Sequence, residues 1–71
     1  MEVYVFKTNI ENQNMVSQLN NVLSQQQNIN QWTVDTEDCD NVLRIVSSKK
    51  IPEINLIKLV HQVGFQCEPL L

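Results

Sequence analysis

The chain has 71 residues, of which 42% are hydrophobic, and its five basic and eight acidic side chains give a formal net charge of -3. One glycine and two prolines are too few for a linker or a disordered tail, so we expect a small core. The few cations are scattered, which argues against nucleic-acid binding, because phosphate neutralisation needs clustered positive charge. No apolar run approaches the ~18 residues that span a membrane, and no signal peptide precedes the first apolar residues. We therefore expect one cytoplasmic domain over residues 1–71, with no membrane association.

Residues 1–10 predict a strand, because β-branched and aromatic side chains dominate and both faces are apolar, as in an interior strand. Residues 11–27 predict a helix, since apolar residues recur there at three- and four-residue spacing among Asn, Gln and Ser. Asn12 or Asn14 is expected to cap its first turn, because a short amide accepts from the free N–H groups there.

Two short strands are predicted next, over residues 32–35 and 42–47. The first alternates apolar and polar side chains, and the acid-rich segment 36–41 joins the two as a hairpin turn.

A second helix is predicted from Pro52 to Gly64. The fixed φ of Pro52 suits a helix start, and Gly64 tolerates the left-handed conformation that ends one. Residues 65–68 are long enough for a last strand, which we expect Pro69 to end.

This order predicts an α+β fold of the ferredoxin-like βαββαβ type, a four-stranded antiparallel sheet with two helices on one face. The side chains expected on the helix-covered face are Tyr4, Phe6, Ile10, Trp32, Val34, Leu43 and Ile45. The valines expected on the open face are Val3, Val5, Val42 and Val46. Neighbouring apolar residues on an exposed face indicate association, so we expect a protein partner or a weak homodimer there.

Three local sequences are Lys7-Thr8-Asn9-Ile10, Trp32-Thr33-Val34-Asp35 and Val63-Gly64-Phe65. Together they resemble heavy-metal-associated domains of the copper-chaperone type, and most closely the small stand-alone bacterial members. The resemblance covers nearly the whole chain. It implies the same fold and a relation to proteins that bind and transfer copper.

The resemblance fails at the metal loop. In that family a hydrophobic residue, here Ile10, precedes an x-C-x-x-C segment, and Asn12 and Met15 stand where the two cysteines would be. Two thiolates hold Cu(I) or Zn²⁺ as soft anionic ligands, whereas an amide and a thioether are neutral. We therefore expect a degenerate loop with no metal and no cofactor. Phe65 matches the family's aromatic beside the metal loop, and here we expect it to pack as core.

The function that follows is a non-enzymatic interaction or regulatory module. The alternative is a copper chaperone with altered ligands, holding Cu(I) through Met15 with Cys67 or a partner's thiols. Cys39 is expected to lie too far away to share an ion, and His61 to be exposed at a helix end. A ligand sensor of the amino-acid-binding kind shares this topology, but such a sensor would require glycines in the loop at residues 11–14, and this chain has none there.

Catalysis and disulfide bonding find little support. A nucleophile beside a base, or paired carboxylates in a cleft, is needed for most enzymes, and here acids cluster only in the hairpin turn. A chain this short is also expected to leave little room for a pocket of ~300 Å³. Cys39 and Cys67 form no CxxC, so two reduced thiols are expected.

Overall fold

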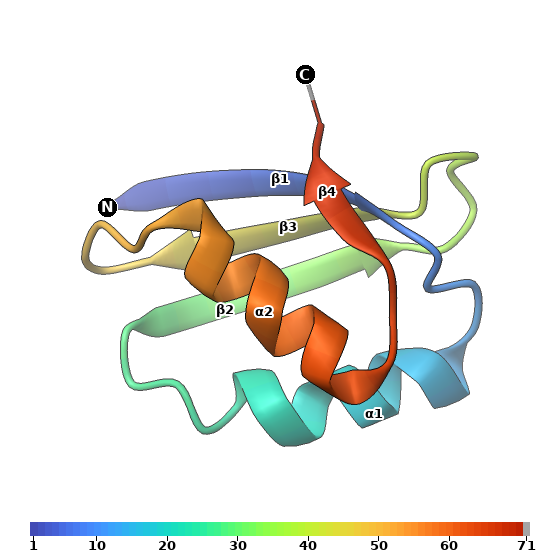
Figure 1. Cartoon of the computed structure of the whole chain (residues 1–71), viewed down its shortest axis with the longest axis horizontal. Helices are drawn as coiled ribbons and strands as arrows, with labels where there is room; N and C mark the ends of the chain where they lie inside the picture. The colour runs from blue at the N-terminus through green and yellow to red at the C-terminus, as the bar shows by residue number, and fades with distance from the viewer. Residues whose placement is uncertain (71) are drawn as a thin grey trace.

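The protein is described by a computed structural model that covers residues 1–70. Its elements are β1 (Glu2–Thr8), α1 (Gln13–Leu23), β2 (Ile29–Asp35), β3 (Val42–Ser47), α2 (Glu53–Val63) and β4 (Cys67–Pro69). The strands form one antiparallel sheet in the order β2-β3-β1-β4, and both helices lie on one side of it (Figure 1). The ferredoxin-like prediction is confirmed. No helix in this part of the chain is long and apolar enough to cross a membrane.

The core lies between the sheet and the helices, as the strand alternation predicts. Phe6, Leu43 and Ile45 of the two central strands are fully buried, and they meet Leu19 of α1 and Val60 of α2 in one apolar cluster. All seven residues expected on the helix-covered face belong to this cluster or pack against it. On the other face, Val3 is 52% exposed and Val5 is 37% exposed.

Two buried polar side chains were not anticipated. The Thr8 hydroxyl donates to the Asn41 carbonyl at 2.6 Å and accepts from the Ile10 N–H at 3.2 Å. Ser47 is fully buried, and its hydroxyl donates to the Lys49 carbonyl. Because burying an unbonded hydroxyl is unfavourable, these bonds explain how both side chains sit in the core. The Thr8 bond also ties the hairpin turn to the end of β1.

The helix predicted over residues 11–27 is shorter in the structure. Asn12 is extended, with a φ of -150°, and α1 begins after it. At the other end, the N–H of Gln25 donates to Val22 and that of Gln26 donates to Leu23. These bonds tighten the last turn, and Ile29 then enters the sheet. The prediction overran because the Gln-rich tail contains no residue that stops a helix.

Three strand predictions also need correction. The strand predicted over residues 1–10 spans Glu2–Thr8, because the Ile10 N–H donates to the Thr8 hydroxyl rather than to a neighbouring strand. β2 begins at Ile29 rather than residue 32, with an irregularity in its pairing to β3 between Ile29 and Gln31. β4 begins at Cys67 and includes Pro69, which was expected to end it. The N–H of Leu70 donates to the Val5 carbonyl, so the alternation of an antiparallel ladder turns the Pro69 main chain to the free edge. A proline is tolerated there because no ladder bond is lost.

Candidate functional site

The β1–α1 loop stands where the family resemblance places a metal. Fully buried Ile10 anchors its start. The Asn12 side-chain oxygen then accepts a hydrogen bond from the Met15 N–H at 3.0 Å. The Met15 sulfur accepts the Glu11 N–H at 3.4 Å. Both side chains at the cysteine positions are therefore engaged with the main chain, and Asn12 is the N-cap of α1.

The donor set of this loop does not fit a thiolate-held ion. Asn12 is exposed and offers a neutral, hard oxygen that already accepts a main-chain N–H. Met15 is half-buried and offers only an uncharged thioether, which packs against the core. Neither group neutralises the charge of Cu(I) or Zn²⁺, as two thiolates do.

The loop is held from the far end of the chain as well. The Asn9 side-chain oxygen accepts the Gln66 N–H at 2.9 Å, which joins the end of β1 to the segment before β4. Phe65 belongs to the same buried cluster as Ile10, and Met15 packs against that cluster. Phe65 is thus a core residue, as expected. The Asn9 bond was not anticipated, because nothing local in the sequence indicates a partner 57 residues away.

Cys67 lies opposite Thr8 in the β1–β4 pair and is 8% exposed. Burial, with a contribution from the charge of Glu68, raises its thiol pKa from 9.0 to about 11. A thiol with this pKa is protonated at neutral pH and is a poor nucleophile and metal ligand. The expectation of a buried, inert thiol therefore agrees with its environment.

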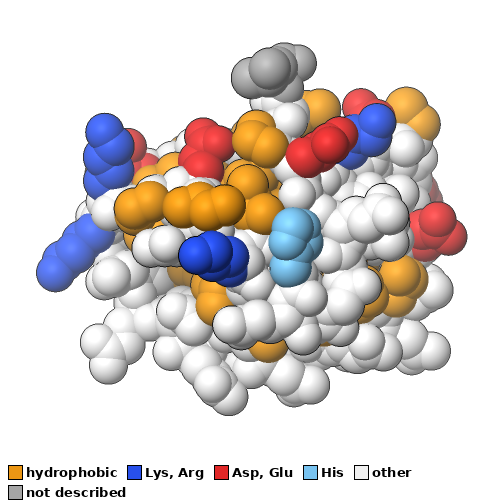
Figure 2. Space-filling model, viewed as in Figure 1, with side chains coloured by type: hydrophobic (Ala, Val, Ile, Leu, Met, Phe, Trp, Pro, Cys, Tyr) orange, Lys and Arg blue, Asp and Glu red, His pale blue; other side chains and the backbone are white. Residues whose placement is uncertain are grey.

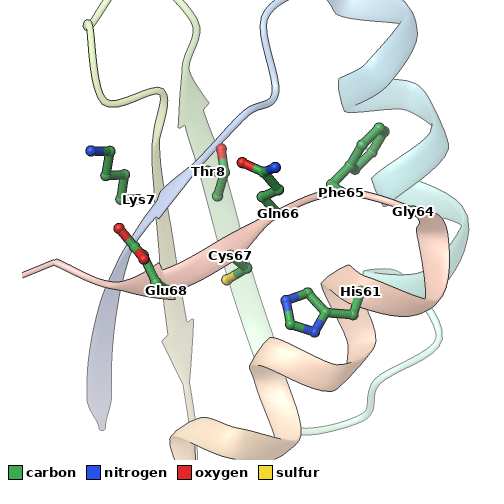
Figure 3. A pocket seen from close by; sticks show the side chains of 8 residues that line it. All are labelled: Lys7, Thr8, His61, Gly64, Phe65, Gln66, Cys67 and Glu68. Carbon is green, nitrogen blue, oxygen red and sulfur yellow. The ribbon is translucent and has the colours of Figure 1, made fainter.

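A surface depression of about 500 Å³ lies beside β4, so the expectation of little room for a pocket was wrong. It is partly open to solvent and is lined by the end of β1, the C-terminal end of α2, the α2–β4 connection and the edge strand β4. Figure 3 shows His61 and Cys67 among its lining side chains, and Met15 is not one of them. The full lining is Lys7, Thr8, His61, Gly64, Phe65, Gln66, Cys67 and Glu68.

The acid-rich hairpin turn contains the other thiol. Cys39 is exposed, and its sulfur lies within 4.8 Å of carboxylate oxygens of Asp38 and Asp40. These carboxylates already have roles in the turn: Asp38 accepts the Asp40 N–H at 2.8 Å, and Asp40 lies 3.7 Å from the Lys7 ammonium. Such bonds are typical of polar turns, so the cluster is explained without an ion.

The open sheet face is a second candidate surface. Val3 pairs with Val46, and Val5 pairs with Arg44, across the central strands β1 and β3. On the other side of β3, Arg44 pairs with Thr33. The valines expected here do share this face. Sequence reasoning missed Arg44, although its parity in β3 places it between Val42 and Val46.

The helix-covered side differs in character. Figure 2 shows a mostly white lower half beside α1, made of uncharged polar side chains and main chain, and apolar groups nearer α2. The exposed amides that contribute to the α1 surface are Gln13, Asn14, Gln18, Asn20 and Asn21.

Comparison with known proteins places the fold but not the activity. No protein-family model matches the chain, and no curated protein matches it by sequence. Solved structures do match. The yeast copper transporter domain Ccc2a is 11% identical, with a TM-score of 0.82, over 100% of this chain and 97% of that chain. A chain of the Atx1–Cu(I)–Ccc2a complex is 11% identical, with a TM-score of 0.85, over 100% and 97%. The first domain of the human copper chaperone for SOD1 is 16% identical, with a TM-score of 0.78, over 94% and 89%.

The fold is that of heavy-metal-associated domains. The resemblance drawn from the three local sequences is thus confirmed at the level of fold. At identities of 11–16% these matches carry no statement about metal, partner or activity in this chain. Function must be argued from its own residues.

Proposed function

We propose that this chain is a single-domain, non-enzymatic interaction module with the heavy-metal-associated fold, and that its degenerate β1–α1 loop does not hold metal. It acts by docking a protein partner on the open sheet face. A reducing compartment such as the cytoplasm suits its two unpaired thiols.

One observation carries the proposal. At the two positions where the related fold carries thiolates, Asn12 accepts from the Met15 N–H and the Met15 sulfur accepts from the Glu11 N–H. The side chains of Asn12 and Met15 thus bind main-chain N–H groups at the start of α1. A soft metal ion would have to break this cap and would find no thiolate at either position.

The existence of a protein partner is supported by two further points. The open face exposes aliphatic side chains, Val3 and Val5, that nothing in the described chain covers. A match of the same fold is a chain in the Atx1–Cu(I)–Ccc2a complex, so this scaffold is found in a protein–protein assembly elsewhere.

The alternative is a copper chaperone with altered ligands, Met15 and Cys67. The half-buried Met15 thioether and the Cys67 thiol belong to one packed core, which is the observation in its favour. A protonated Cys67 with a pKa of about 11 works against it, because Cu(I) would have to displace that proton.

A Cu(I) titration of the reduced protein against a chromophoric chelator separates the two. We expect no competition with the chelator, in the wild type or in Met15→Ala and Cys67→Ala. Cys39→Ala is the matched control for the exposed thiol. Tight one-to-one binding that either Met15→Ala or Cys67→Ala abolishes would overturn the metal-free proposal and establish the alternative.

A further inference from the structure

Arg44 is a cation on the open face, with valines around it on β1 and β3 and polar side chains beside it on β2. On the open face it lies between Val42 and Val46 along β3, beside Val5 of β1 and Thr33 of β2. It is exposed, and among residues 1–70 the one ion pair within 4.0 Å joins Lys7 to Asp40. Arg44 therefore has no carboxylate partner within the described chain.

The nearest acid by register is already engaged. Asp35 pairs with Val42 across β2 and β3, so it is a diagonal neighbour of Arg44 on the same face. One oxygen of its carboxylate, Oδ1, accepts the N–H groups of Glu37 and Asp38, at 3.1 and 3.2 Å, and so closes the hairpin turn, and no ion pair within 4.0 Å joins Asp35 to Arg44. The guanidinium is left free to bind a group from outside, and its planar fork matches a carboxylate.

Two arrangements of a second copy that stack the valines against one another do not supply that group. In a face-to-face dimer the two-fold axis lies in the plane of the interface. If the axis runs parallel to the strands and between β1 and β3, Val3 of one copy faces Val46 of the other. In the same arrangement Arg44 of one copy faces Val5 of the other. If the axis runs perpendicular to the strands at the level of Arg44, Arg44 of one copy faces Arg44 of the other. Both arrangements of the valines bury the cation without an anion, which is strongly unfavourable.

We propose that the open face binds a protein partner that presents a carboxylate between aliphatic side chains, and that Arg44 is its anchor. This inference rests on the proposed function and specifies its partner. The valines supply the apolar contact, and the guanidinium pairs with the carboxylate as water is excluded. Arginine surrounded by apolar contacts is a common arrangement of residues that dominate binding at protein interfaces.

A random peptide library displayed on phage tests this. Wild type should select peptides with Asp or Glu between aliphatic residues, and Arg44→Glu should select Lys or Arg at that place. Arg44→Gln should weaken binding of the wild-type peptides at least tenfold, whereas Lys58→Gln, which also removes one positive charge but at an exposed site on α2, should leave binding unaffected. Amide NMR spectra confirm that each variant is folded.

The outcomes separate this inference from the proposed function. If the peptides lack an acid or bind Arg44→Gln as well as wild type, but lose binding to Val5→Lys, the face docks a partner and the role of Arg44 is wrong. If no peptide is enriched, or binding survives Val5→Lys, the docking face itself is wrong. Sedimentation should show a monomer, and a wild-type dimer that Val5→Lys dissociates would make a second copy the occupant and overturn the inference.

Discussion

Asn12 stands where the family resemblance places a metal ligand, yet its amide oxygen is directed at the Met15 N–H. An N-cap satisfies one of the donors that every helix start leaves free. Helix α1 has no acidic residue in its first turn and no basic residue in its last turn, so no such charge complements its dipole. The cap is therefore the main local device that fixes where α1 begins.

Asn12→Ala should lower the free energy of unfolding by about 1 kcal/mol, because the Met15 N–H loses its acceptor. Urea denaturation followed by circular dichroism measures this change. Asn14→Ala, in the same turn and also exposed, is the matched control and should change stability by less than ~0.5 kcal/mol. Equal losses in both variants would contradict the capping role.

Cys67 allows a prediction about pH. Its pKa rises from 9.0 in the unfolded chain to about 11 in the folded one, chiefly through burial. The unfolded state thus loses this proton first, and the stability linked to Cys67 is full below pH 9 and is lost as the pH rises towards 11. The wild type should lose more stability across this window than Cys67→Ala does, measured by urea denaturation at each pH. Parallel curves would show that the thiol is not linked to folding.

At the scale of elements, Gly64 ends α2 in the left-handed region, with a φ of 105°. Its N–H donates to the His61 carbonyl at 2.9 Å, and the Phe65 N–H donates to Val60 at 3.3 Å. This double closure turns the chain so that Phe65 enters the core.

Gly64→Ala should reduce stability by about 1–2 kcal/mol through backbone strain alone. A Cβ at this position would meet nothing within 4 Å, so no clash contributes. Thermal unfolding of Gly64→Ala beside Gln62→Ala, an exposed change in the same turn, measures the difference. A Gly64→Ala protein as stable as wild type would mean that the turn adapts to a right-handed conformation.

The elements were predictable to different degrees. Alternation placed the expected residues of β1, β2 and β3 on their correct faces, because a strand has a period of two whatever it pairs with. Ile10 is buried as expected, but it lies after β1 in the loop. The end of α1 was not predictable, since it depends on Ile29 joining β3. Buried Thr8 was missed for a similar reason, because its acceptor on Asn41 lies 33 residues away. In the candidate loop, the sequence predicted the absence of thiolates and offered Asn12 as a cap, but not the bond from Glu11 to the Met15 sulfur.

At the scale of the whole molecule, the fold is shared with proteins whose sequences are very different. The chain shares 11% identity with the yeast copper domain and still superposes over its full length with a TM-score of 0.82. To share this fold, the two chains need only the same pattern of buried faces and the same order of elements, and many sequences meet both requirements. A loop on such a scaffold can change its chemistry without changing the core.

The tolerance of this fold to changes in sequence predicts that a metal site can be built in the β1–α1 loop. Asn12→Cys with Met15→Cys places two thiols at the spacing used by the related fold, so the double variant should bind one Cu(I) tightly in the chelator competition. Because it also removes the N-cap, its apo form should be less stable than wild type by about 1 kcal/mol, and Cu(I) should reverse the loss.

Asn12→Cys with Asn14→Cys is the control, with two thiols in the same loop at the wrong spacing. It should bind Cu(I) at least tenfold more weakly than the first pair. If the two variants bind alike, the β1–α1 loop does not have the geometry of a copper loop, and the likeness ends at the fold. If only Asn12→Cys with Met15→Cys binds Cu(I), then the identity of the side chains at positions 12 and 15 is the reason that the wild-type loop does not bind metal.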